Sequence, residues 1–181
     1  MIYVFLADGF EELEALAPVD ILRRGGLNVK TVGVGGKTVC GAHKIPVVCD
    51  ITEGEAATDG LEGIILPGGM PGTLNLEKSK CVQRFIDFAA KNGLYIGAIC
   101  AAPSILGHRG LLKGKKATCF PGFEKDLDGS EFTDLPVVTD GKITTACGAG
   151  AAFDFGFRLL SELTDNKEGA DALKKSMKYG K

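Results

Sequence analysis

The stretch Leu94-Tyr-Ile-Gly-Ala-Ile-Cys100-Ala-Ala-Pro103-Ser-Ile-Leu106 runs from an apolar segment typical of a buried β-strand, through a cysteine, into a helical pattern. Such a strand-turn-helix junction lifts one side chain out of the end of a sheet and directs the first backbone N–H groups of the helix toward it. Small residues surround Cys100, as a tight turn requires, and Pro103 suits the first helical turn. We therefore predict that Cys100 is a nucleophile.

The reactivity of Cys100 has two readings. A helix N-terminus favours a thiolate, so we expect the pKa of this thiol to be lowered, to be the lowest among the cysteines, and to make Cys100 the first to oxidise. Free cysteines are, however, more often small apolar residues buried in a core. The strand-turn-helix junction and its small neighbours make the two readings about equal.

The composition is that of an ordinary soluble protein. With 181 residues, 45% hydrophobic and 24% charged, the chain predicts a single domain over residues 1–181. A net charge of −2 gives no electrostatic footprint for nucleic acid or an anionic membrane, so we expect neither partner. The apolar start at 1–7 lacks basic residues and runs into acidic ones, unlike a signal peptide, and no apolar run reaches the length of a membrane span. We expect a cytoplasmic protein.

The cysteines predict neither disulfides nor a metal centre. There are six of them, without C-x-x-C spacing or an export signal, and we expect reduced thiols. The two histidines, His43 and His108, have no clustered ligands in the sequence, so we predict no metal site and structural or solvated roles for both. The cysteines are Cys40, Cys49, Cys81, Cys100, Cys119 and Cys147.

Strand patterns alternate with helical patterns along the whole chain. The continuous apolar runs at 2–7 and 61–66 suit central strands covered on both faces. Pro46 restricts the strand at 45–49 to an edge or an interface, and Asp140-Gly141 predicts a hairpin. The order indicates an α/β sandwich with a mostly parallel sheet. The remaining expected strands are 28–34, 38–40, 94–99, a short one within 111–119, 136–139 and 142–147, and the expected helices are 11–24, 78–91, the segment after Cys100, the acidic segment after Phe123, 151–163 and 166–178.

Ligands of such a sheet gather beyond the carboxyl ends of its strands. Four parts of this chain are expected there: residues 8–14, 67–72, Cys100 and 147–150. The pair Gly148-x-Gly150 before a helix is a weak anion-binding signal.

The first expected helix carries the candidate acid. Glu14 shares a face with Pro18 and Ile21, so we predict that it is partly buried. Burial beside the cysteine would raise the pKa of this carboxyl and let it move a proton. We expect Glu11 and Glu12 to be solvated acids that favour the helix N-terminus.

The loop after the strand at 61–66 carries the candidate oxyanion site. Gly68 and Gly69 can bring backbone N–H groups close to a bound oxygen, and the N–H of Ala101 is expected beside them. A glycine pair in this position is also compatible with a simple tight turn.

Together these segments resemble the ThiJ/PfpI superfamily, the group that contains the Parkinson-disease-associated protein deglycase. The resemblance covers essentially the whole chain. It implies a flavodoxin-like three-layer sandwich, close to class I glutamine amidotransferases, with Glu14 against the sulfur of Cys100. The matching segments are Asp8-Gly9-Phe10-Glu11-Glu12-Leu13-Glu14, Pro18-Val19-Asp20, Leu66-Pro67-Gly68-Gly69, Ala98-Ile99-Cys100-Ala101-Ala102-Pro103 and Gly148-Ala149-Gly150.

The resemblance also implies a homodimer, and we expect its interface at the first helix and the edge at 46–49. It implies several roles: cofactor-free action on reactive carbonyls or glycation adducts, redox sensing or chaperoning, and, by an older label, a link to thiazole monophosphate biosynthesis. Many relatives carry a histidine where this chain has Phe120, so the resemblance does not support a Cys-His pair and peptidase activity is not expected. The first hypothesis is a deglycase or glyoxalase-like enzyme, and the alternative is a redox-regulated binding protein.

Overall fold

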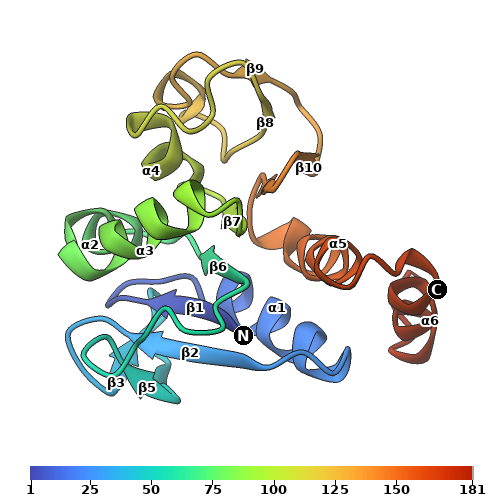
Figure 1. Cartoon of the computed structure of the whole chain (residues 1–181), viewed down its shortest axis with the longest axis horizontal. Coiled ribbons are helices and arrows are strands. Elements are labelled where there is room, and N and C mark those ends of the chain that lie inside the picture. Colours follow the sequence, from blue (N-terminus) through green and yellow to red (C-terminus); the bar gives the residue numbers. More distant parts are fainter. Residues whose placement is uncertain (181) are drawn as a thin grey trace.

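A computed structural model describes residues 1–180, and a seven-stranded sheet forms its centre (Figure 1). The strands are β1 (Ile2–Leu6), β2 (Val29–Gly33), β5 (Ile51–Thr52), β6 (Gly63–Leu66), β7 (Tyr95–Ile99), β10 (Val137–Asp140) and β11 (Ile143–Ala146). Their order is β10-β11-β7-β6-β1-β2-β5, and every neighbouring pair is parallel except β10 and β11. The predicted hairpin across Asp140-Gly141 is confirmed, because β10 and β11 pair as antiparallel neighbours.

The central strands are buried on both faces, as their continuous apolar sequences predict. All five residues of β1 and all four of β6 are buried. Ile2 lies in register with Val29 on one side and with Gly63 on the other. β1 is therefore in the middle of the hydrophobic core.

Helices cover both faces of the sheet. On one face a hydrophobic cluster joins the sheet to α1, α5 and α6, and includes Val4 and Phe155. On the other face a second cluster, which includes Phe5 and Phe85, joins the sheet to α2, α3 and α4. This arrangement confirms the predicted three-layer α/β sandwich (Figure 1). The helices are α1 (Glu12–Arg24), α2 (Gly72–Lys78), α3 (Lys80–Lys91), α4 (Pro103–His108), α5 (Ala152–Thr164) and α6 (Lys167–Ser176).

The helix predicted over 78–91 is confirmed as α3, and a helix that was not predicted, α2, precedes it. The extended backbone of Ser79 (φ −71°, ψ 116°) ends α2 and begins α3, where its hydroxyl accepts a hydrogen bond from the N–H of Val82 at 3.3 Å. Serine suits this position because its side chain satisfies an otherwise unpaired N–H of the first turn. The acidic segment after Phe123 is a short 3₁₀ turn, η1 (Glu124–Asp126), rather than an α-helix.

Two small sheets lie outside the main one. β3 (Thr38–Cys40) pairs with β4 (Pro46–Val48) as an antiparallel hairpin, and β8 (Lys116–Ala117) pairs with β9 (Glu131–Phe132) in parallel. The strand with Pro46 pairs on one side only, with β3, which agrees with the predicted edge position.

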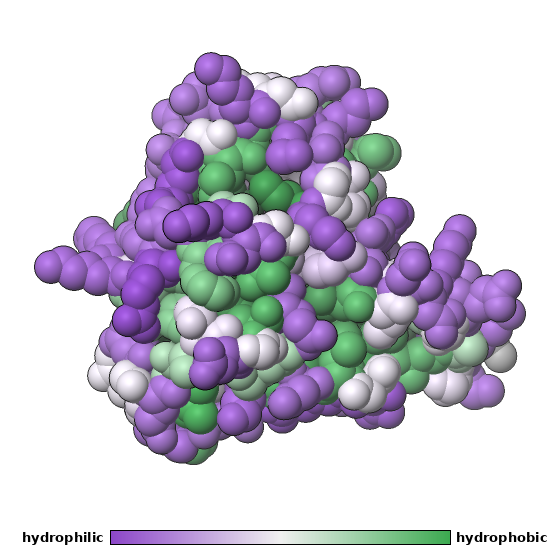
Figure 2. Space-filling view, viewed as in Figure 1, coloured by the Kyte–Doolittle hydropathy of each residue, from purple (hydrophilic) through white to green (hydrophobic). Residues whose placement is uncertain are grey.

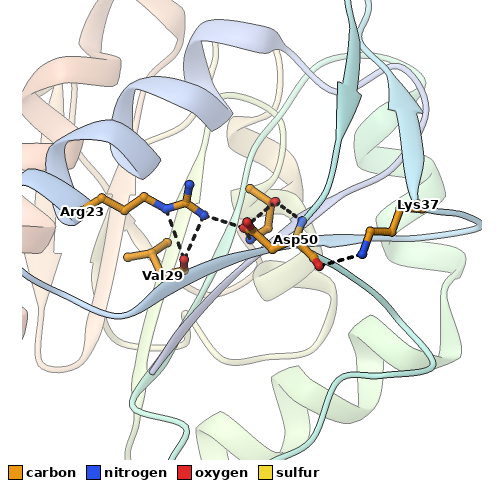
Figure 3. A network of polar contacts seen from close by, with 5 residues as sticks. Arg23, Val29, Lys37 and Asp50 are labelled. Carbon is orange, nitrogen blue, oxygen red and sulfur yellow. Dashed lines mark hydrogen bonds and ion pairs between the residues drawn. The ribbon is translucent and has the colours of Figure 1, made fainter.

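Asp50 ties the β3–β4 excursion to the rest of the fold (Figure 3). Its carboxylate accepts hydrogen bonds from the N–H and hydroxyl of Thr31 at 2.7 and 2.9 Å, and it also pairs with Arg23. Arg23 in turn donates to the carbonyl of Val29, and Lys37 donates to the Asp50 carbonyl at 2.9 Å. This network joins the end of α1 to β2, so the excursion after β2 is held in place.

The surface view agrees with this architecture. Hydrophilic residues cover the rim of the face shown in Figure 2, and hydrophobic residues are visible in its middle. Among the helices of residues 1–180, none is both long and apolar enough to cross a membrane.

Candidate active site

The site lies at the switch point of the sheet, where successive strands are added first on one side of β1 and then on the other. β1 has β2 on one side and β6 on the other, and β7 follows beyond β6. The segments after β1, β6 and β7 therefore emerge at the same edge, which is the usual ligand position in a parallel sheet. They bring Glu14, Gly68 and Cys100 to one place.

Cys100 occupies a strained turn between β7 and α4. Its φ of 64° is in the left-handed region that non-glycine residues rarely adopt. The turn is fixed from both sides: the Cys100 N–H donates to the carbonyl of Ala146 at 2.8 Å, and the Cys100 carbonyl accepts from the N–H of Phe120 at 2.8 Å. The backbone N–H groups of Gly69 and Ala101 face the Cys100 sulfur and act to lower the pKa of its thiol. The strand-turn-helix junction thus presents its thiol as the sequence predicts.

Glu14 is the carboxyl group of the site. Its side chain comes from α1 and the residue is 1% exposed, so it is more deeply buried than its partly apolar helix face alone indicates. Its Oε2 accepts a hydrogen bond from the N–H of Gly68 at 2.9 Å. Burial and the charge of Glu11 together raise the pKa of Glu14 to about 7, and hydrogen bonds from Cys100 and Gly68 partly oppose the change. Glu14 is therefore a base of near-neutral strength, in line with the predicted direction.

The expected lowering of the Cys100 pKa is wrong. Burial, the charge of Glu14 and the hydrogen bond to Glu14 raise the pKa of Cys100 to about 12, and the N–H groups of Gly69 and Ala101 only partly offset this. The helix that was expected to stabilise a thiolate, α4, has six residues. Desolvation and a neighbouring carboxylate outweigh a short helix dipole. At neutral pH the thiol keeps its proton next to a carboxylate that can accept it.

The glycines of the loop after β6 have separate roles. A Cβ on Gly68 would lie 2.7 Å from the Cβ of Cys100 and 2.7 Å from Oε2 of Glu14, so only glycine fits. Gly69 has a φ of 86°, which favours glycine independently. The expected oxyanion site needs one correction: the N–H of Gly68 already binds Glu14, so the donors that face the sulfur are Gly69 and Ala101.

Phe120 and Gly148 lie on the other side of the turn. The Phe120 ring packs against Gly148, because a Cβ on Gly148 would lie 3.2 Å from its Cδ2 atom. Phe120 is 47% exposed. Gly148 precedes the short 3₁₀ turn η2 (Ala149–Ala151), which leads into α5. The structure therefore brings together all the residues that the sequence singled out for the site.

Glu12 and His43 form a link that the sequence did not reveal. Glu12 is 5% exposed, so the expectation of a solvated acid is wrong. Its Oε1 accepts from the His43 N–H at 2.8 Å, and its Oε2 lies 2.8 Å from the His43 Nδ1. Burial acts to raise the pKa of Glu12, but the hydrogen bonds from His43 and Ile45 keep it below its ordinary value. The loop before β4 is fastened to α1 in this way.

The same link gathers residues of metal-ligating type. Glu11, Glu12 and His43 each bring a ligand atom to within 4.8 Å of the other two, although the sequence shows no such cluster. Their hydrogen bonds account for this closeness, because both oxygens of Glu12 are engaged by His43. His108 lies elsewhere and pairs with Glu77 at 2.6 Å.

Helical periodicity missed Glu12 because its partner lies far away in the sequence. It also missed the role of Glu11, whose Oε2 accepts from the N–H of Glu14 at 2.8 Å and caps α1. Glutamate is not among the preferred capping residues, so the sequence carried no strong signal of this contact.

Comparison with known proteins agrees with the fold. The model of the DJ-1/PfpI family matches residues 1–162. Protein dj-1beta of Drosophila melanogaster is 32% identical over 174 residues, which cover 94% of this chain and 93% of that protein. A glutathione-independent glyoxalase of Caenorhabditis elegans is 30% identical over 166 residues, which cover 91% of this chain and 88% of that protein.

A solved structure extends the likeness to three dimensions. The crystal structure of a cysteine-to-alanine mutant of a DJ-1 superfamily protein from Salmonella typhimurium superposes with a TM-score of 0.94 at 33% identity, and the match covers 99% of this chain and 98% of that one. The resemblance inferred from the sequence motifs is thereby confirmed. With the sandwich fold and the cysteine turn in place, the chain belongs to the DJ-1/PfpI family.

Proposed function

We propose that this protein converts small α-oxoaldehydes, or their early adducts, into α-hydroxy acids without a cofactor, through Cys100 and Glu14. The observation that carries the proposal is the buried carboxyl of Glu14, whose pKa is raised to about 7, in hydrogen-bond contact with the Cys100 sulfur. A relative named glutathione-independent glyoxalase supports the same chemistry. This role would place the protein in the response to reactive-carbonyl stress.

The first step is addition of the thiol to the aldehyde. As the Cys100 sulfur bonds to the aldehyde carbon, the Glu14 carboxylate accepts the thiol proton, and the carbonyl π electrons move to oxygen. The N–H groups of Gly69 and Ala101 face the sulfur, so they adjoin the oxygen that gains charge. Proton return from Glu14 to that oxygen gives a neutral hemithioacetal.

The second step moves hydrogen between the two carbons of the substrate. Glu14 removes the proton from the former aldehyde carbon to give an enediol, and a proton returns to the neighbouring carbon. The product is a thioester of the α-hydroxy acid on Cys100. Water then hydrolyses the thioester, which releases the acid and restores the thiol. The substrate is oxidised at one carbon and reduced at the next, so no external oxidant is needed.

Phe120 limits the range of this chemistry. A histidine there would provide a second proton-transfer group, which typically contributes roughly 10² to 10⁴ in rate, and phenylalanine cannot. An aldehyde is electrophilic and needs no amine leaving group, whereas amide hydrolysis must protonate one. We therefore expect slow conversion of α-oxoaldehydes and no appreciable peptidase or amidase activity.

The raised pKa of Cys100 also favours carbonyl chemistry over peroxide sensing. Peroxides react with the thiolate, and this thiol keeps its proton at neutral pH. In the carbonyl reaction Glu14 removes the proton during attack, so a free thiolate is not required.

We further propose a homodimer that uses the outer face of α1 and the β3–β4 hairpin. Leu13 on α1, Ile45 beside β4 and Val48 in β4 are 57%, 52% and 71% exposed. Large apolar side chains with this exposure are typical of interfaces when they lie together, and the proline-bearing strand leaves an edge that proteins usually cover.

The function is tested by incubating purified protein with methylglyoxal in the absence of glutathione and measuring lactate by proton NMR. We expect lactate from the wild-type protein and none above background from Cys100→Ser. Equal lactate from both proteins would overturn the proposal, and so would its absence from the wild type. A peptide substrate in parallel checks the expected lack of peptidase activity.

A further inference from the structure

Phe120 is an exposed aromatic side chain, whereas several phenylalanines of this chain are fully buried. Phe5, Phe10, Phe85 and Phe155 are all 0% exposed, whereas Phe120 is 47% exposed. Phe120 follows β8 by a few residues and lies next to Cys100, at the edge where the parallel strands of the central sheet end. Packing of the core therefore does not explain a phenylalanine at this position.

The backbone fixes this ring next to the reactive turn. The Phe120 N–H donates to the Cys100 carbonyl at 2.8 Å, and the Phe123 N–H donates to the Phe120 carbonyl at 3.1 Å. These bonds hold both sides of the residue. The ring packs closely against the backbone of Gly148, because a Cβ added to Gly148 would lie 3.2 Å from Cδ2 of Phe120. The residue as a whole is 47% exposed, and its backbone is hydrogen-bonded directly to Cys100.

We propose that Phe120 is a specificity-determining residue that contacts the substituent R of an α-oxoaldehyde R–CO–CHO bound at Cys100, and that it selects aromatic R over methyl. This inference rests on the proposed function and names its substrate class. An aromatic R can pack edge-to-face or offset against the Phe120 ring, with a gain beyond the apolar area it buries. A strongly polar R would lose hydrogen bonds to water at this ring without replacement.

The selectivity is tested by comparing kcat/KM for phenylglyoxal and methylglyoxal. We expect the wild-type protein to prefer phenylglyoxal and Phe120→Ala to reduce that preference by roughly 2- to 10-fold, the range typical of one aromatic contact. Phe120→Leu keeps an apolar side chain without the ring and should lie between the two. Phe132 in β9 is exposed to a similar extent, 42%, so Phe132→Ala serves as the matched control and should keep the wild-type ratio.

A second measurement does not depend on turnover. The rates at which phenacyl bromide and bromoacetone alkylate Cys100 are each divided by their rates with N-acetylcysteine, which removes intrinsic reactivity. We expect the corrected ratio to favour phenacyl bromide in the wild type and Phe132→Ala, and to fall in Phe120→Ala.

The two measurements separate the two claims. Absent turnover with a Phe120-dependent alkylation ratio would overturn the proposed function and retain the aromatic contact. Turnover together with ratios that Phe120→Ala leaves unchanged would overturn the role of Phe120 and retain the proposed function.

Discussion

The N–H of Gly68 donates a hydrogen bond of 2.9 Å to Oε2 of Glu14, inside the protein. This bond joins the end of β6 to α1 and holds the carboxyl group beside the Cys100 sulfur. It also takes the Gly68 N–H out of the set of donors for a substrate oxygen. The position of Glu14 therefore depends on a backbone group, and on the absence of a side chain at Gly68.

Gly68→Ala should damage both the fold and the site. The added Cβ would lie 2.7 Å from Cys100 and from Glu14, so one of them must move. We expect a loss of about 1–3 kcal/mol in the free energy of unfolding, measured by urea denaturation, because overpacking a rigid interior costs this much. The nearest neighbour of a Cβ on Gly36 would be 3.9 Å away, so Gly36→Ala is the control and should be nearly neutral. Equal stability of the two variants would refute the close packing at Gly68.

Glu14→Gln should stabilise the protein increasingly as pH rises. The pKa of Glu14 is about 7 in the folded protein and 4.5 for an ordinary glutamate, so the folded state binds this proton more tightly. The wild type therefore loses stability as pH rises from 4.5 to about 7, by roughly 3 kcal/mol if the group acts alone. Glutamine carries no charge and escapes this loss.

The measurement is chemical denaturation of both proteins at pH 4.5 and pH 8. The gain in the free energy of unfolding of Glu14→Gln over the wild type should grow between these pH values. For Glu168→Gln, at an exposed position, the difference from the wild type should be the same at both. A stability difference that is independent of pH would show that Glu14 is not a raised-pKa carboxyl.

The same substitution should speed the oxidation of Cys100. Removing the Glu14 charge removes a cause of the raised pKa of Cys100, so more thiolate is present at a given pH. Peptide mapping after mild peroxide treatment at pH 7.5 should find sulfinate at Cys100 earlier in Glu14→Gln than in the wild type. Slower oxidation in the variant would mean that Glu14 stabilises the thiolate by donating a proton to it.

Much of the fold was accessible from the sequence because its determinants are local. The runs at β1, β6 and β7 are continuously apolar and end at glycine, proline or the cysteine turn, so both their strand character and the edge where they end follow from the residues. Helix α2 was not predicted, because the Pro71-Gly72 pair at its start is typical of a loop.

The sequence predicted which residues form the site, but it did not predict the burial of Glu12 or the direction of the Cys100 pKa shift. The helical phase of Glu14 indicates burial correctly. Glu12 is buried by the loop that contains His43, which packs on α1, and helical periodicity does not indicate that contact. The sign of the Cys100 pKa shift depends on how deeply distant segments bury the sulfur together with Glu14. A prediction made from the helix N-terminus alone therefore had the wrong sign.

Val48→Asp should dissociate the proposed homodimer. Val48 is 71% exposed, and a charge there would be buried without a partner in an interface at the β3–β4 hairpin. Light scattering at micromolar concentration should give a dimer mass for the wild type and a monomer mass for the variant. Leu135, 56% exposed and outside this hairpin, provides the control Leu135→Asp, which should stay dimeric. A monomer mass for the wild type would contradict the proposal.

The central claim, that Cys100 and Glu14 act as one unit, is tested most directly by a double-mutant cycle on lactate formation from methylglyoxal. Cys100→Ser and Glu14→Gln should each lower kcat/KM by about 10² or more, and the double variant should be no slower than the slower single variant, because residues that act together are not additive. Wild-type rates in Glu14→Gln, or losses that multiply in the double variant, would contradict the claim.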